Sequence, residues 1–213
     1  MSATSSKEIS GYVYADSRQS HAHNFLLPRI GQIIASRHFT SKRAFDLGCG
    51  NGAVASWLAQ KGWEVAGVDP SEQGIAEANK SYPHINLSLG SCYDDLAAKF
   101  GGYSLIISLE VVEHVYDPRS YALCLNKLLN PGGIALISTP YHGYLKNLVL
   151  AATGKLDAHF TALWDHGHIK FWSIKTINAL LKESGLSVVE VHRVGRIPTL
   201  ARSMIIVAEK SSH

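Results

Sequence analysis

Short apolar runs alternate with amphipathic stretches along most of this chain. Seven of these runs have the length and composition of β-strands. The expected strands are residues 44–47, 64–68, 85–89, 105–109, 134–138, 187–192 and 204–208. Apolar positions at helical spacing predict helices around them. The expected helices are residues 20–38, 53–61, 72–81, 94–99, 119–129 and 176–184.

This alternation predicts an α/β fold in which a mainly parallel sheet carries helices on both faces. The last two strands are an exception, because they are joined without a helix, through Gly195 to Pro198. The simplest geometry for that connection is a hairpin at the sheet edge. We therefore expect a doubly wound, mainly parallel, seven-stranded Rossmann-like sheet with an antiparallel edge hairpin.

The length of 213 residues suits a single domain with a sizeable core, spanning residues 1–213. Residues 1–10 are polar and rich in serine, and we expect a flexible tail there. Residues 141–170 break the strand–helix rhythm after the fifth strand, on the side where open α/β sheets bind ligands. We expect this insert to form a lid or an acceptor pocket.

Composition narrows the classes of function and location. The formal net charge is only +3, and the basic residues form no block, so we expect no nucleic-acid partner. Three cysteines, Cys49, Cys92 and Cys124, suit neither a disulfide framework nor a zinc site. The polar N-terminus does not resemble a signal peptide, and no apolar run approaches the length of a spanning helix. These features predict a cytoplasmic protein.

A glycine-rich loop follows the first strand and opens a helix. It contains Asp46, Gly48, Cys49, Gly50 and Gly52 in the order D-L-G-C-G-N-G. Glycines at this spacing let the backbone turn sharply and approach a ligand closely. The G-x-G-x-G spacing differs from the dinucleotide fingerprint G-x-G-x-x-G, which disfavours a nicotinamide enzyme.

The second strand ends on an acidic residue, Asp69. A carboxylate at this place accepts hydrogen bonds from two ribose hydroxyls, which fixes a nucleoside. The alternative is that Asp69 caps the helix that follows. The glycine loop upstream favours the ligand role.

Four motifs occur in the order that is typical of class I S-adenosylmethionine-dependent methyltransferases. They are the glycine loop, Val68-Asp69, the run Ser108–Val115 and Asn130-Pro131-Gly132-Gly133. The chain resembles that family over residues 44–139. Within the family it is similar to the O-methyltransferases of ubiquinone biosynthesis. They share an E-x-x-E-H run, here Glu110 to His114, and an insert that a histidine and a Lys-Phe pair close, here His166 to Phe171.

The resemblance implies S-adenosyl-L-methionine as cofactor and S-adenosyl-L-homocysteine as product. It places Gly48, Cys49 and Gly50 under the methionine part and Asp69 on the ribose. The remaining expected contacts are Asp46 and Gly52 in the loop, Pro70 beside the adenine, Ser91 on the adenine amino group, Cys92 and Tyr93 as walls, Leu109 beside the sulfonium, and Arg29 or residues 21–23 on the methionine carboxylate. Ser91 is a departure, because the family usually has an acidic residue near this position.

Methyl transfer requires alignment of donor and acceptor, and a base where the acceptor must lose a proton. Glu110, Glu113 and His114 lie on one side of a turn and form a candidate site for a hard divalent ion such as magnesium. The E-x-x-E-H run also occurs in methyltransferases without metal. In that alternative, the candidate catalytic bases are His142, His166 and His168.

We therefore expect a methyltransferase that acts on a small acceptor, with a phenolic or quinol-like oxygen as the leading hypothesis. N- or S-methylation of another metabolite, methylation of nucleic acid, a non-catalytic cofactor-binding protein and a dehydrogenase are the alternatives. The tetrapeptide N/D-P-P-Y/F of many base-amino methyltransferases is absent from the sequence. Peripheral contact with a membrane is a further alternative for the apolar insert.

Overall fold

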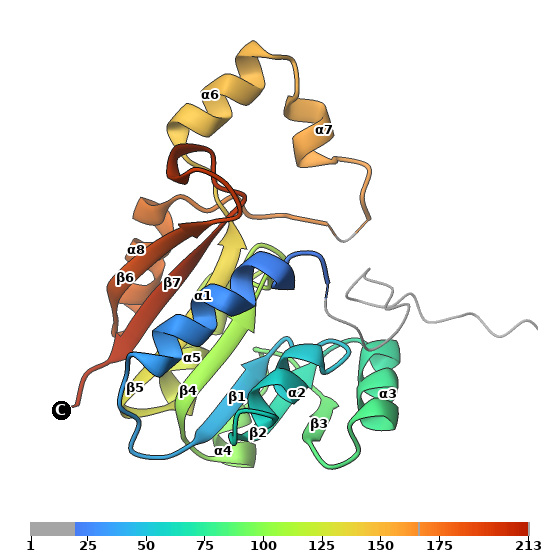
Figure 1. Cartoon of the computed structure of the whole chain (residues 1–213), viewed down its shortest axis with the longest axis vertical. Helices are drawn as coiled ribbons and strands as arrows, with labels where there is room; N and C mark the ends of the chain where they lie inside the picture. Colours follow the sequence, from blue (N-terminus) through green and yellow to red (C-terminus); the bar gives the residue numbers. More distant parts are fainter. Residues whose placement is uncertain (1–19, 166, 213) are drawn as a thin grey trace, which may run out of the picture.

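The computed structural model of the protein describes residues 20–165 and 167–212, so the expected tail at residues 1–10 lies outside the described residues. Within the described ranges, seven strands form one sheet in the order β3-β2-β1-β4-β5-β7-β6 (Figure 1). The first five strands in this order, β3, β2, β1, β4 and β5, are parallel to one another, and β7 is antiparallel to both of its neighbours. The strands are β1 (Arg43–Leu47), β2 (Glu64–Asp69), β3 (Asn86–Leu89), β4 (Tyr103–Leu109), β5 (Leu129–Pro140), β6 (Leu186–Val194) and β7 (Ser203–Lys210). The predicted fold class is confirmed.

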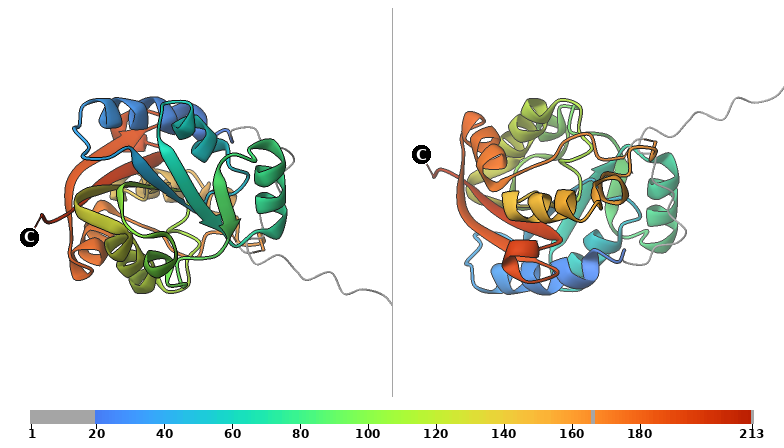
Figure 2. Two further views of the ribbon diagram at one scale, coloured as in Figure 1. Left: turned by 90° about the horizontal axis from the view of Figure 1, so that it is seen from below. Right: turned by 90° about the horizontal axis from the view of Figure 1, so that it is seen from above.

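Helices cover both faces of this sheet, as the left view of Figure 2 shows. One face carries α1 (His23–Ala35), α2 (Ala53–Ala59) and α3 (Glu72–Ser81). The other face carries α4 (Leu96–Phe100), α5 (Pro118–Leu128) and α8 (Ile174–Glu183). Successive residues of the buried strand β4 serve opposite cores, since Leu105 and Ile107 join the first and Ile106 joins the second. Alternation of this kind is the geometry of a strand buried on both faces.

Side-chain caps determine where several helices begin. The Ser71 hydroxyl accepts a hydrogen bond of 3.0 Å from the N–H of Gly74 at the start of α3. Asp117 caps α5, and Pro118 follows it in the first turn. A capping box between Ser173 and Thr176 starts α8. These contacts satisfy N–H groups that a helix leaves unpaired. Ser71, rather than Asp69, is therefore the cap of α3.

The hairpin prediction is confirmed, and its order in the sheet is now defined. β6 and β7 are joined through a short 3₁₀ turn at Pro198–Leu200. β7 lies between β5 and β6, so β6 is the edge strand. β5 begins at Leu129, earlier than expected, because Leu129 already pairs with Tyr103 before an irregularity in the register.

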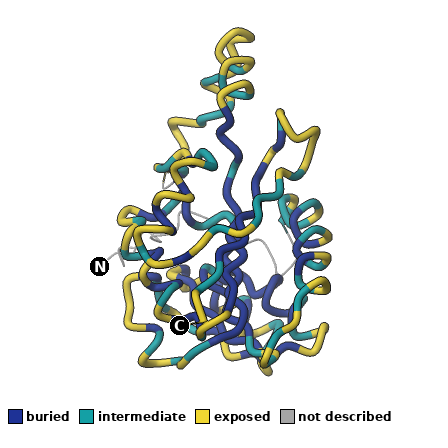
Figure 3. The backbone as a smooth tube through the Cα atoms, turned by 90° about the vertical axis from the view of Figure 1, so that its left-hand side faces the viewer, coloured by how far each residue is buried: buried dark blue, intermediate teal, exposed yellow. Residues whose placement is uncertain are grey.

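The insert forms α6 (Tyr144–Ala152) and α7 (Leu156–Phe160), which stand beyond the carboxyl ends of the parallel strands (Figures 1 and 2). No residue of α6 is buried, and Figure 3 shows this helix at the top of the fold in the colours of exposed and intermediate residues. Among the described residues, no helix combines the length and apolarity that crossing a membrane requires. The position of the insert agrees with the expected one, and its role as a lid or pocket stays a prediction.

Candidate active site

The glycine loop joins β1 to α2 at the carboxyl end of the sheet (Figure 1). Gly48, Gly50 and Gly52 have φ values of 85°, 50° and 77°. A Cβ atom on residue 48 would lie 2.4 Å from Cγ2 of Val111. Positive φ and this close approach both favour glycine, because it has no side chain to clash. The N–H groups of Gly48 and Cys49 donate to the carbonyl oxygen of Val68 at 2.8 and 3.0 Å, so internal hydrogen bonds hold the loop in a shape that lets its backbone approach a ligand closely.

Asp69 ties the end of β2 to this loop. One carboxylate oxygen accepts a hydrogen bond of 2.9 Å from the N–H of Gly50, and the other accepts one of 2.8 Å from Ser71. The side chain is 6% exposed. Asp69 thus stabilises the loop in addition to the role expected for it at the ribose, which stays a prediction.

Asp46 lies buried close to Asp69. Burial and the negative charge of Asp69 raise the pKa of Asp46 to about 7, although a backbone hydrogen bond from Ala55 acts in the opposite direction. Its Oδ2 has no hydrogen-bond partner among the described residues. Cys49 is also buried, and burial raises the pKa of its thiol well above the usual value, so the thiol is unreactive.

The loop after β3 contains the residues that are expected to contact the adenine of the cofactor. Ser91 accepts a hydrogen bond of 3.2 Å from the N–H of Tyr93, and the Tyr93 hydroxyl accepts one of 3.1 Å from the N–H of Asp117. Tyr93 therefore connects this loop with the turn before α5. Cys92 is buried and Pro70 is exposed. The adenine contacts assigned to these residues stay predictions.

Strand β4 ends on Leu109, which is 9% exposed, and the chain then turns at Glu110. Glu110 has a φ of 55°, a strained value for a residue with a side chain. The Ser138 hydroxyl donates a hydrogen bond of 2.8 Å to one oxygen of the Glu110 carboxylate, and the Ser203 hydroxyl donates a longer one of 3.4 Å to the other oxygen. Burial raises the pKa of Glu110 to about 7.

Glu113 is almost fully buried, with 1% of its surface exposed. Neither carboxylate oxygen has a hydrogen-bond partner among the described residues. Burial, and then the charge of Glu110, raise its pKa well above the usual value. A buried carboxyl group is costly in its charged form, so burial favours the protonated form of Glu113, and a cation beside it would favour the charged form.

The structure brings His168 to the E-x-x-E-H turn. Ligand atoms of Glu113, His114 and His168 all lie within 4.8 Å of one another. The two imidazole rings are 4.9 Å apart, and Trp164 packs edge-on against both. Glu110 is directed to the two serines instead. The expected metal set of Glu110, Glu113 and His114 stays a prediction, and the structure places His168 beside the last two of these residues.

The end of the insert is hydrogen-bonded to the same turn. The N–H groups of Ile169 and Lys170 donate to the Glu113 carbonyl oxygen at 2.9 and 3.0 Å. The buried Trp172 side chain donates through Nε1 to the carbonyl oxygen of Val112 at 3.0 Å. The sequence indicated His-Gly-His-Ile-Lys-Phe at residues 166–171 as a motif but did not predict these contacts, because they join segments nearly sixty residues apart.

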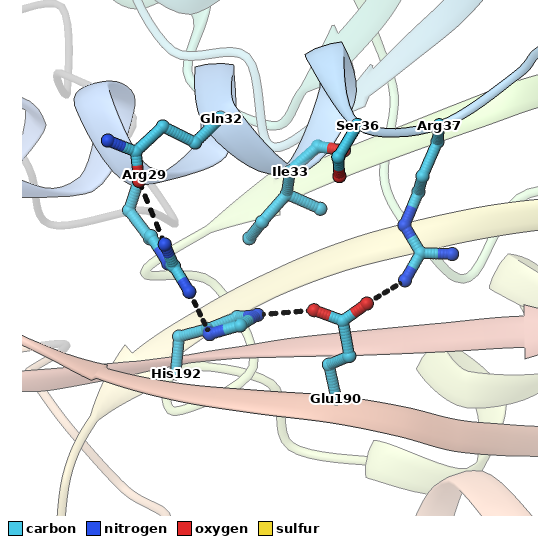
Figure 4. Close-up of polar contacts among 7 residues, drawn as sticks. All are labelled: Arg29, Gln32, Ile33, Ser36, Arg37, Glu190 and His192. Carbon is cyan, nitrogen blue, oxygen red and sulfur yellow. Dashed lines mark hydrogen bonds and ion pairs between the residues drawn. The ribbon is translucent and has the colours of Figure 1, made fainter.

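Arg29 lies on α1 and reaches the edge strand β6 (Figure 4). Its guanidinium contacts His192 Nδ1 at 2.8 Å and donates to Gln32 Oε1 at 2.8 Å. His192 Nε2 is 2.7 Å from Glu190, which also pairs with Arg37. Arg29 thus links α1 to β6, and its expected contact with the methionine carboxylate stays a prediction.

Residues 21–23, the alternative for that carboxylate, are also engaged at the start of α1. His21 Nε2 lies 2.9 Å from Nη1 of Arg202, just before β7. The N–H of Ser20 donates to His23 Nδ1 at 3.1 Å. Burial lowers the pKa of His23 to about 4, so this histidine is neutral at pH 7 and offers no charge to a carboxylate.

The three candidate histidine bases have different outcomes. His166 lies outside the described residues. Burial is the main cause that lowers the pKa of His142 to about 4, and the same holds for His168. Both are therefore neutral at pH 7, but each is a weaker base than a free imidazole.

A groove of about 750 Å³ opens at the amino ends of β1, β2 and β3, with Arg43, Trp63 and Tyr103 in its lining. The glycine loop, Asp69 and Glu110 lie at the carboxyl ends of the strands. This groove is therefore on the opposite edge of the sheet from the candidate site.

Comparison with known proteins agrees with this arrangement. The sequence profile of a methyltransferase domain family matches residues 18–191. The ubiquinone biosynthesis O-methyltransferase of Burkholderia pseudomallei is 27% identical over 187 residues, which cover 84% of this chain and 79% of that enzyme. The enzyme of the same name from Roseobacter denitrificans is 31% identical over 159 residues, which cover 71% of this chain and 62% of that enzyme.

Solved structures share the fold at lower sequence identity. The S-adenosylmethionine-dependent methyltransferase of Mesorhizobium loti aligns with a TM-score of 0.64 and 18% identity, covering 84% of this chain and 96% of that one. Magnesium protoporphyrin IX methyltransferase from Synechocystis, with bound S-adenosyl-L-homocysteine, aligns with a TM-score of 0.62 and 21% identity, covering 86% and 81%. The chain therefore belongs to the methyltransferase domain family, and its fold is that of the S-adenosylmethionine-dependent methyltransferases.

Proposed function

We propose that this protein transfers the methyl group of S-adenosyl-L-methionine to an oxygen of a small phenolic or quinol-like acceptor. The insert carries this proposal, because it sets neutral histidines and aromatic rings beyond the carboxyl ends of β4 and β5. Curated relatives at 27–34% identity are named ubiquinone biosynthesis O-methyltransferase, which supports an acceptor of this class.

The glycine loop and Asp69 fit the proposed cofactor. Positive φ at Gly48 and Gly50 lets the chain turn sharply at the carboxyl end of β1, where its backbone can come close to a ligand. Each carboxylate oxygen of Asp69 can accept more than one hydrogen bond, so the side chain can serve both the loop and the ribose. Leu109 would flank the sulfonium. When bound, the cofactor supplies an electrophilic methyl group.

The chain itself would align the acceptor and handle its proton. A histidine base with an ordinary pKa would be well matched to proton removal near pH 7. Because the pKa values of His142 and His168 are about 4, complete proton transfer to either imidazole is less favourable than transfer to such a base. A hydrogen bond from the hydroxyl to a neutral imidazole is the role that these pKa values favour.

A metal-assisted form of this reaction is the second candidate. The unpartnered, buried carboxylate of Glu113 fits a cation, and His114 and His168 supply imidazole nitrogens near it. Two imidazoles and one carboxylate are more typical of zinc than of magnesium. An ion held there would lower the pKa of an acceptor hydroxyl. Metal analysis of the purified protein and of His168→Ala tests this form. Equal and negligible metal content in both, with activity unaffected by a chelator, would reject it.

Incubation with labelled S-adenosyl-L-methionine and a panel of catechol, aniline and thiophenol tests the proposed function. We expect label on catechol oxygen in the unmodified protein and much less in Asp69→Asn when the cofactor concentration is below the Kd of that variant. Label on aniline or thiophenol alone would replace the proposal with N- or S-methylation. Absence of transfer to every acceptor, with the cofactor still bound, would favour a non-catalytic protein.

We also propose that α6 contacts a membrane surface. Leu145 and Leu148 are 53% and 65% exposed on this helix. Neighbouring exposed leucines on one helix form an apolar surface that a membrane interface can cover. Co-sedimentation with vesicles of phosphatidylcholine and phosphatidylglycerol should fall in Leu145→Ser/Leu148→Ser. Leu123→Ser, at an exposed leucine of α5, is the matched control. Equal sedimentation of all three proteins would contradict membrane contact.

A further inference from the structure

Four ring side chains meet where the insert returns to the domain. His142 follows β5, His159 and Phe160 end α7, and Phe171 precedes α8. His142 lies with its ring centroid 5.5 Å from His159, 5.7 Å from Phe160 and 5.1 Å from Phe171, and the two phenylalanines are 4.8 Å apart. We call these residues the His–Phe cluster. Three separate segments build it, so the insert must be folded back for the cluster to exist.

Two imidazole nitrogens of the cluster lack a partner. His142 Nδ1 and His159 Nε2 are buried and make no hydrogen bond with any described residue. Asn147, on α6, interacts with His142, but its Oδ1 makes no hydrogen bond of normal geometry either. Folded proteins seldom leave buried polar atoms unpaired, and packing alone would be served by phenylalanine at both positions. The two nitrogens therefore leave hydrogen-bonding capacity for a ligand with polar atoms, which must part the surrounding rings to reach them because both atoms are closed to solvent.

We propose that the His–Phe cluster is the recognition pocket for the acceptor, in which His142 Nδ1 and His159 Nε2 hydrogen-bond the oxygens of a hydroxylated aromatic ring. This assignment rests on the proposed function, because it names the groups that hold that acceptor. A hydroxyl both donates and accepts a hydrogen bond, and so does a neutral imidazole, so the two groups are complementary. Phe171 is 47% exposed, so part of its side chain is available for contact with an aromatic ligand.

The charge state of the cluster agrees with a neutral acceptor. Burial, followed by the charge of Lys146, lowers the pKa of both His142 and His159, and that of His142 falls to about 4. Both imidazoles are therefore uncharged at pH 7. A carboxylate ligand would bring no proton for an accepting nitrogen, whereas a phenolic hydroxyl brings one.

The test measures how catechol binds to the full-length protein saturated with S-adenosyl-L-homocysteine, by calorimetry. A second probe, 1,2-dimethoxybenzene, keeps the ring but cannot donate a hydrogen bond. His142→Phe and His159→Phe keep a ring in the cluster and remove its nitrogens. We expect each variant to raise the Kd of catechol about tenfold, as for the loss of one buried hydrogen bond. The Kd values of dimethoxybenzene and of S-adenosyl-L-homocysteine should not change.

His84→Phe is the matched control, because His84 is exposed in the connection between α3 and β3, outside the cluster. Unchanged catechol affinity in His142→Phe and His159→Phe overturns the assignment, and so does the absence of catechol binding by the unmodified protein. Equal losses for both probes also overturn it, because packing would then explain them. Catechol binding without methyl transfer rejects the proposed O-methylation and leaves the recognition pocket standing. If His142→Phe does not fold, His159→Phe on the exposed helix α7 decides.

Discussion

Replacing Asp69 by asparagine tests the connection between β2 and the glycine loop. The carboxylate accepts hydrogen bonds from the N–H groups of Gly50 at 2.9 Å and Ser71 at 2.8 Å. The asparagine side chain has one acceptor oxygen, so its NH₂ group would face one of these two donors. The substitution therefore removes at least one hydrogen bond from the loop, and it also removes an acceptor from the proposed ribose site.

The magnitude follows from the charge on the acceptor. Hydrogen bonds to a charged group contribute about 1.5–3 kcal/mol each. Loss of one should raise the Kd of S-adenosyl-L-homocysteine about 10- to 150-fold. The effect on folding should be smaller, because the same substitution removes the negative charge that raises the pKa of Asp46. Ionised Asp46 is then easier to bury, which offsets part of the lost stability.

Calorimetric titration with S-adenosyl-L-homocysteine measures the change in affinity, and urea unfolding at the same pH measures the change in stability. Asp95→Asn is the control. Asp95 caps α4 by accepting from the N–H of Ala98, and asparagine caps a helix about as well as aspartate. A Kd for Asp69→Asn within twofold of the unmodified protein would refute the placement of the cofactor at this loop.

Three further predictions concern stability and acceptor binding. Gly48→Ala should destabilise the protein by about 1–3 kcal/mol, because of its positive φ and its overlap with Val111; the double variant with Val111→Ala should recover part of that loss in thermal unfolding, and no recovery would mean that overlap is not the cause. The raised pKa of Asp46 makes the folded state bind this proton more tightly than the unfolded state, so the free energy of unfolding should fall as the pH rises from about 4 to about 7. The urea midpoints at pH 5 and pH 8 should differ less in Asp46→Asn than in the unmodified protein, and an unchanged difference would assign the effect to other groups. Trp172→Phe removes the hydrogen bond to Val112 and should raise the KM for the acceptor while leaving the Kd of S-adenosyl-L-homocysteine unchanged; a parallel loss of cofactor affinity would show general unfolding instead.

The fold was predictable because its signals are local. Apolar runs and helical spacing depend on neighbouring residues, and the strand–helix alternation restricts the topology to a parallel sheet. The glycine loop was predictable for the same reason, since sharp turns with positive φ require glycine at fixed spacing. The motifs around it led to the methyltransferase family, which the family profile confirms.

The surroundings of these motifs were harder to predict. Arg29 was expected at the cofactor, and the structure shows its contact with His192, on an edge strand more than 160 positions later in the chain. Glu110 was expected beside a metal, and two serines of β5 and β7 hold its carboxylate. In both cases the chosen residue type was suitable for the expected role, and the partner that the structure shows comes from a distant segment.

The sequence by itself therefore determined the sheet, the position of the glycine loop and the family, because each depends on short-range patterns. Only the tertiary structure decided which side chains share an environment. It brought His168 to Glu113 and His114, and it set His159 against His142. It also lowered the pKa values of His142 and His168, since burial depends on what packs around a group and not on its neighbours in sequence.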